Sequence, residues 1–161
     1  MEASSPTRQG LLQLLNEIND CLVRMDESQK NLLSALAEMS PYINLNSSKL
    51  NLDPHWHASW KLWKQELGVF FQALRHAQEA YQDLSSQMQS LLADRTTQDP
   101  LLQGLANQGA ALLKDLQKRQ SLAQYIEELF QVLDKSIQQD KISSTQKQKI
   151  EDLVFRLHLL F

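Results

Sequence analysis

The residue types that most often carry catalysis are few in this chain, and their spacing assembles no catalytic set. Cys21 is the single cysteine and lies beside an apolar helical seam, where a small buried thiol is more typical than a nucleophile. The neighbouring carboxylates Glu127 and Glu128 fall on a long polar face. Because catalysis needs a base, a nucleophile and a group that orients them, the sequence predicts a protein that is not an enzyme.

The histidines do not combine into a metal site at helical spacing. His55 and His57 are two positions apart, so their side chains point to different sides of a helix. His76 and His158 have no acidic or metal-ligating partner one turn away, and we expect both on the surface. The Glu-x-x-His pairs that bind two metal ions in helical bundles do not occur. We therefore expect no bound metal.

Composition argues against several other classes of ligand. The four glycines are scattered within expected helices, so no Gly-rich loop can surround a phosphate group, and Gly109 instead suggests a close approach of two helices. The net charge is −3 and no basic stripe of the kind that binds nucleic acid is present. We find no secretory signal and no transmembrane run. These features predict a cytoplasmic, or else nuclear, protein without cofactor or nucleic acid, and make membrane binding an unfavoured reading.

The strongest pattern in the sequence is an unbroken apolar seam whose steps alternate between four and three residues. It comprises Trp56, Trp60, Trp63, Leu67, Phe70, Leu74, Ala77, Tyr81, Leu84, Met88 and Leu91. A mean step of 3.5 residues keeps one face of a helix toward a partner helix. Asp53 followed by Pro54 is a helix start signal. We predict a helix over 54–95, roughly 60 Å long.

Two further segments carry the same alternation and predict helices over 6–40 and 100–140. Both start at a polar residue followed by proline, and the first should end before Pro41, because the residue preceding a proline disfavours helix. The short connection before 100–140 requires that helix to run antiparallel to its predecessor. Three matched seams joined in this way predict a long antiparallel bundle.

The segment 41–53 breaks the helical pattern, being rich in Asn and Ser. It still contains the apolar residues Tyr42, Ile43, Leu45, Leu50 and Leu52. We expect a loop that packs back on the end of the bundle. The alternative is a loop that binds a partner.

The last segment, 144–161, predicts a helix about half as long as the others. As a helix it buries Ile150, Leu153, Val154, Leu157 and Leu160 against the bundle. It would then cover the half that contains the tryptophans, giving four helices there and three at the other end. Apolar residues also alternate from Phe155 to Phe161, which leaves a strand as the alternative. The fold class we expect is all-α, a single domain over 1–161 with three long antiparallel helices and a short C-terminal fourth helix.

Gln29 and Arg119 are the polar entries in the seams of 6–40 and 100–140. A buried guanidinium is costly unless it is paired, and we expect Asp20 or Glu79 as its partner. The pair of polar residues would then set the register of the bundle, as buried polar groups do in coiled coils. Alternatively, Arg119 marks a place where the seam is open and meets another chain.

Two apolar groups at the same end of the bundle are candidates for a partner interface. The first is the row Trp56, Trp60 and Trp63, for which the alternative is core packing with the indole N–H groups at the rim of the core. The second consists of Phe155, Leu159 and Phe161, which stay exposed if the last helix buries only one face. Exposed apolar surface of this kind usually marks an interaction site.

These features favour a non-enzymatic protein–protein interaction module, a helical subunit or adaptor of a larger assembly. It would bind a protein partner or a second copy through the last segment and the Trp-rich end. A ligand pocket among the tryptophans is the least favoured reading.

An export or assembly chaperone that shields a client helix is the alternative function. Flagellar and type III export chaperones are small, acidic and helical, and the chain resembles them broadly in size and layout. The stretch from Met25 to Gln29 is similar to one found in some of them. The resemblance covers a small part of the chain and implies a helical fold and a protein client.

Overall fold

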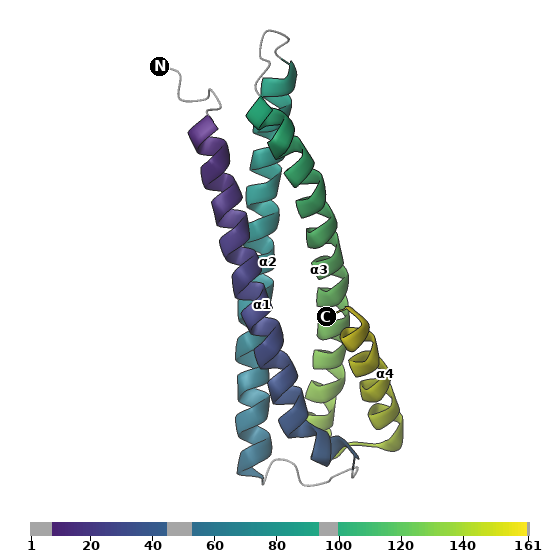
Figure 1. Ribbon diagram of the computed structural model, residues 1–161. Coiled ribbons are helices and arrows are strands. Elements are labelled where there is room, and N and C mark those ends of the chain that lie inside the picture. Colours follow the sequence, from purple (N-terminus) through teal and green to yellow (C-terminus); the bar gives the residue numbers. More distant parts are fainter. Residues whose placement is uncertain (1–7, 45–52, 94–99, 161) are drawn as a thin grey trace.

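The computed structural model describes residues 8–44, 53–93 and 100–160. Within them the chain forms four helices, three of them long: α1 (Arg8–Asn44), α2 (Pro54–Ala93), α3 (Pro100–Gln139) and α4 (Ser144–Leu160). The long helices run antiparallel in sequence order and make an elongated bundle (Figure 1). The predicted all-α fold with a short fourth helix is confirmed. The ends predicted at 6, 95 and 161 lie outside the described residues.

Side-chain caps explain where α2 and α4 begin, and a backbone motif explains where α3 ends. Ser143 and Gln146 exchange hydrogen bonds at the start of α4: the Ser143 hydroxyl accepts from the Gln146 N–H at 3.1 Å, and the Gln146 side chain accepts from the Ser143 N–H at 2.9 Å. Asp53 caps α2 in a similar way. At the end of α3, Asp140 adopts a left-handed conformation with φ 58°, and the Lys141 N–H donates back to the Ser136 carbonyl at 3.1 Å.

The first helix does not end before Pro41, and that part of the prediction was wrong. α1 continues through Pro41 to Asn44, so the first residues of the expected loop 41–53 are helical, while 45–52 lie outside the described residues. A proline inside a helix removes one backbone hydrogen bond. Continuing the helix buries Ile43 and places Tyr42 edge-on to Trp56, with ring centroids 5.3 Å apart. This packing offsets the lost bond.

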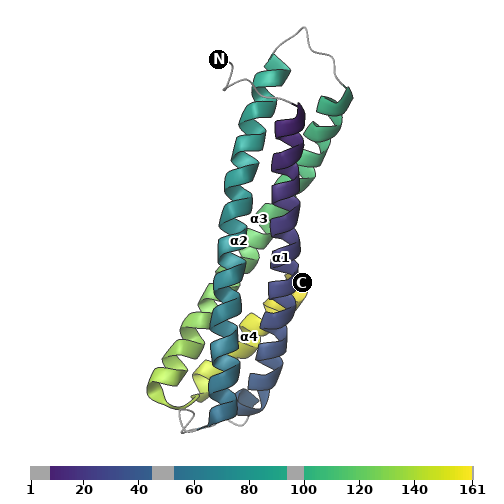
Figure 2. The same cartoon turned by 90° about the vertical axis from the view of Figure 1, so that its left-hand side faces the viewer.

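Two adjoining hydrophobic cores fill the bundle. One core contains buried residues from all four helices and includes the three tryptophans. The other joins α1, α2 and α3 alone, through residues such as Leu11, Leu84 and Leu105. Figure 2 shows α3 crossing behind the α1–α2 pair, with α4 beside the half that holds the larger core. The expected change from four helices to three along the bundle is confirmed.

The fourth segment is helical to Leu160, so the strand alternative for its end was wrong. Ile150, Leu153 and Leu157 are buried, and Val154 and Leu160 are half-buried, which matches the expected inner face. Burying the three side chains contributes roughly 5–9 kcal/mol before the entropy cost of ordering the helix is subtracted. α4 is therefore anchored on the bundle.

Gly109 does not mark a close approach of two helices. A Cβ atom built on Gly109 would meet no neighbouring atom within 4 Å. The expectation of a tight helix contact there was wrong, because α2 and α3 leave room at this height of the bundle.

Candidate interaction surface

The three tryptophans lie in the four-helix core. Trp56 and Trp63 are fully buried, and Trp60 is 5% exposed. The Trp60 ring stacks on Phe130 of α3, with ring centroids 5.4 Å apart and planes 16° apart. The three tryptophans therefore pack in the core, as the alternative interpretation expected. They offer a partner no exposed tryptophan surface at this end of the bundle.

Two of the indole N–H groups are buried more deeply than the sequence suggested. We expected them at the rim of the core, but Nε1 of Trp56 and of Trp63 is buried with no hydrogen-bond partner among the described residues. Leaving a buried donor unpaired costs roughly 1–3 kcal/mol. The large apolar area of the two rings outweighs that cost.

The most exposed apolar side chains of this end lie on α4. Phe155 is 64% exposed and Leu159 is 70% exposed, the highest values among the large apolar side chains of the described residues. They are four positions apart, so they neighbour each other on the outer face of the helix. Phe161, the third residue of the predicted set, lies outside the described residues. We call Phe155 and Leu159 the outer face of α4.

The residues around this outer face are charged. Glu151 and Asp152, one turn before Phe155, are exposed, as is His158 on the other side. Arg156 turns toward the bundle, and its guanidinium carbon lies 5.6 Å from the centre of the Tyr125 ring. An apolar pair bounded by charged groups is the arrangement found at the centre and rim of many protein interfaces.

Arg119 ties α3 to α1 where α4 ends, but not through the partners we expected. Its Nε donates to Asp115 at 2.9 Å, and its Nη1 lies 2.9 Å from Asp26 Oδ1 as an ion pair without hydrogen-bond geometry. The side chain is only 12% exposed. Asp20 and Glu79 were the wrong candidates. The Asp115–Arg119 spacing of four residues was the sequence signal that could have found the partner.

Gln29 lies at the same height of the bundle as Arg119. It is not, however, the buried polar residue of α1. It is half-buried and lines a cavity of about 180 Å³ together with Arg119 and Leu160. Ser28 occupies the buried position instead, at 1% exposed. The buried face of this stretch keeps the alternation of three and four residues, through Ile18, Cys21, Met25, Ser28, Leu32, Ala35 and Met39. The predicted seam was therefore one residue too far along the chain at Gln29.

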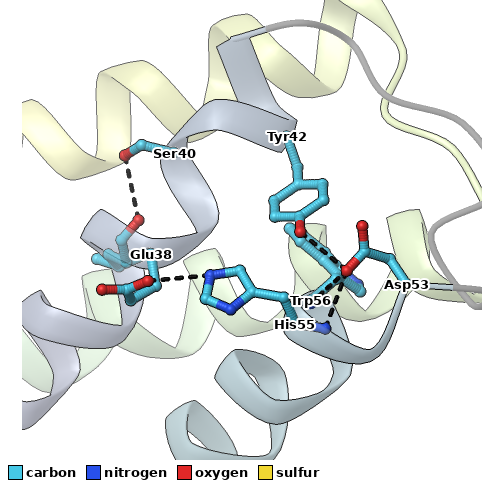
Figure 3. A network of polar contacts seen from close by, with 7 residues as sticks. Glu38, Ser40, Tyr42, Asp53, His55 and Trp56 are labelled. Atoms are coloured by element: carbon cyan, nitrogen blue, oxygen red, sulfur yellow. Dashed lines mark hydrogen bonds and ion pairs between the residues drawn. The ribbon is translucent and has the colours of Figure 1, made fainter.

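A second polar cluster, which the sequence indicated only at Asp53, joins α1 to the start of α2 (Figure 3). Asp53 Oδ1 accepts hydrogen bonds from the Tyr42 hydroxyl at 2.9 Å and from the backbone N–H groups of His55 and Trp56 at 2.9 and 3.2 Å. The bonds from Trp56 and then Tyr42 lower the pKa of Asp53. His55 Nε2 reaches Glu38 at 2.9 Å. The sequence predicted Asp53 as the start of α2, but no fixed spacing links residues across a loop, so the contacts of Tyr42 and Glu38 with this end of α2 could not be predicted.

Cys21, His76 and His158, which we considered for catalysis or metal binding, lie at ordinary buried or exposed positions. Cys21 is buried, and burial raises the pKa of its thiol, against a smaller lowering effect of Arg24. His76 and His158 are exposed, as expected. No group of three His, Cys, Asp or Glu side chains in residues 8–44, 53–93 and 100–160 could hold a metal ion.

In the part of the chain that the structure describes, no helix combines the length and apolar character needed to cross a membrane.

No protein-family model matches the chain, and neither a curated protein nor a solved structure does.

Proposed function

We propose that this chain is a non-enzymatic protein–protein interaction module, a helical subunit or adaptor of a larger assembly. The observation that carries the proposal is the outer face of α4. It holds two large apolar side chains on one turn of a helix that is itself anchored by Ile150, Leu153 and Leu157. A rigid helix that presents an apolar pair is a common way to fill a groove on a partner.

The exposed apolar area of Phe155 and Leu159 sets how much free energy the pair can contribute to binding a partner. Completing the burial of Phe155, now 64% exposed, and Leu159, now 70% exposed, would contribute roughly 2–4 kcal/mol. That range corresponds to about 30-fold to 1,000-fold in affinity. It suits the centre of an interface, and the charged residues around the pair would supply the rim.

A protein partner suits the surroundings of the pair better than a membrane does. Helices that lie on membranes are rich in Lys and Arg on the face beside their apolar stripe. Glu151 and Asp152 stand beside Phe155 instead. Their carboxylates would be repelled by anionic headgroups and would suit a partner with a basic rim.

An export or assembly chaperone remains the alternative function. A chaperone of that type would use a C-terminal helix that is displaced or ordered by its client. The three buried anchors of α4 favour the adaptor, because releasing the helix would expose all of them to water.

Co-purification from the native source tests the proposal. Tagged wild-type chain would be compared with the double variant F155S/L159S and with L12S, a control at an exposed leucine of α1 in the three-helix half. We expect a protein to co-purify with wild type and L12S and to be lost from the double variant. Identical co-purifying proteins from all three would contradict the proposal, as would the absence of any.

A further inference from the structure

An open groove runs between α2 and α3 in the three-helix half, where no residue of α4 contributes to its walls. It consists of two adjoining hollows of about 280 and 420 Å³ that share Tyr81 and Leu113. One hollow extends toward Met88 and Gly109, and the other toward Gln78. Leu113 is 40% exposed and stands between them.

Among the residues that the structure describes, the lining of this groove contains no charged side chain. Charged residues make up 22% of the chain, yet the two hollows are lined only by apolar residues, glycine, glutamines and a serine. The cavity on the other side of α3 differs, because Asp26, Asp115, Lys118 and Arg119 all line it. The absence of charge is therefore a property of this face of the bundle.

An uncharged amide-rich face is suited to bind a copy of itself. Two copies of a chain with net charge −3 repel each other wherever acidic surfaces meet. A glutamine side chain both donates and accepts hydrogen bonds, so a row of glutamines complements an identical row. Gln78 and Gln120 already pair across the groove, with Nε2 donating to Oε1 at 2.8 Å.

From these observations we infer that the α2–α3 groove is a homodimer interface, in which a second copy of the chain is the occupant. A two-fold axis makes each surface patch meet its own copy. Leu113 of each protomer enters the groove of its partner beside Tyr81, and glutamines such as Gln82 and Gln117 surround the contact.

This interface is separate from the proposed function of α4. The outer face of α4 contributes no residue to the groove, so a dimer still presents that face twice. Two linked binding faces raise the apparent affinity for a partner that itself has two sites. An experiment can therefore refute the dimer interface without refuting the proposed function of α4, and the reverse.

Sedimentation analysis of the purified chain over rising concentration tests the inference. The wild-type mass should move from 18.5 kDa toward about twice that value. L113E places two like charges in the contact and should raise the dimer dissociation constant about a hundredfold or more. Q117E, at an exposed position that carries no core packing, should weaken the dimer in the same direction with the fold intact.

The matched control is L62E, because Leu62 is 41% exposed on α2 in the four-helix half. L62E and F155S/L159S should dimerise like wild type. A wild-type mass that stays at 18.5 kDa would overturn the inference. So would a full dimer in both L113E and Q117E, or an equal loss in L62E.

Discussion

Tyr42 donates its phenolic hydrogen to Asp53 at 2.9 Å, joining the last turn of α1 to the N-cap of α2. The same carboxylate oxygen accepts two backbone N–H groups of α2. One oxygen atom thus fixes both the start of a helix and its position against the preceding one. The ring of Tyr42 adds a stacked contact with His55, at 6.1 Å between ring centroids.

Substitutions at this pair should lower stability in a defined order. Y42F removes one hydrogen bond and keeps the ring, so it should lower the urea midpoint slightly. D53A removes the helix cap as well and should lower the midpoint more, whereas D53N keeps a capping side chain and should lie between wild type and D53A. The order would be wrong if Y42F were as destabilised as D53A.

The stability that depends on the charge of Asp53 should disappear in acid. Its folded-state pKa is lowered, chiefly by the Trp56 N–H bond, so the carboxylate stabilises the fold above its ordinary pKa of 3.8. As the pH falls through the lowered folded-state pKa, that contribution is lost. The urea midpoint of wild type should exceed that of D53N near neutral pH and approach it below pH 3.8. A difference that is independent of pH would contradict this assignment.

The two carboxylates beside Arg119 should be partly redundant. D26N or D115N alone should lower the free energy of unfolding by about 0.5–1 kcal/mol, because both carboxylates are partly exposed and screened. The double variant leaves a guanidinium that is only 12% exposed without either partner, so its loss should exceed the sum of the two single losses. Strictly additive losses in a double-mutant cycle would show that the two ion pairs act independently.

The inner and outer faces of α4 should respond differently to truncation. L157A creates a cavity in the four-helix core and should lower the free energy of unfolding by about 2–4 kcal/mol. F155A removes a side chain that is mostly in water and should change it by about 0.5 kcal/mol or less. Denaturant unfolding of the two variants gives the comparison. A large loss in F155A would mean that Phe155 serves the fold and not an interface.

The fold could be predicted where one physical rule dominated each segment. The apolar seams specified three long helices, and polar residues before prolines specified the starts of α2 and α3. The prediction failed at Pro41, because burial of Ile43 outweighed a local helix-breaking preference. It also failed at Gln29, because the adjacent Ser28 occupies the buried position of the seam.

The candidate site was predictable on α4 because a single helix face can be assigned from spacing alone. The Arg119–Asp26 ion pair and the Tyr42–Asp53 bond depend on how helices are placed across loops, and sequence spacing does not encode that placement. The α2–α3 groove also depends on the separation of two helices. Its uncharged lining is visible in the sequence only after the two faces are known to meet.

Site-specific photocrosslinking in the native source can show whether the outer face of α4 binds a protein partner. A photoreactive amino acid at Leu159 should give a discrete covalent adduct with another protein, whereas the same probe at Leu12 should not. Adduct formation from Leu159 should also fall in the F155S background, because the adjacent contact is lost. No adduct from Leu159, or the same adducts from Leu159 and Leu12, would mean that the outer face of α4 does not bind a protein partner.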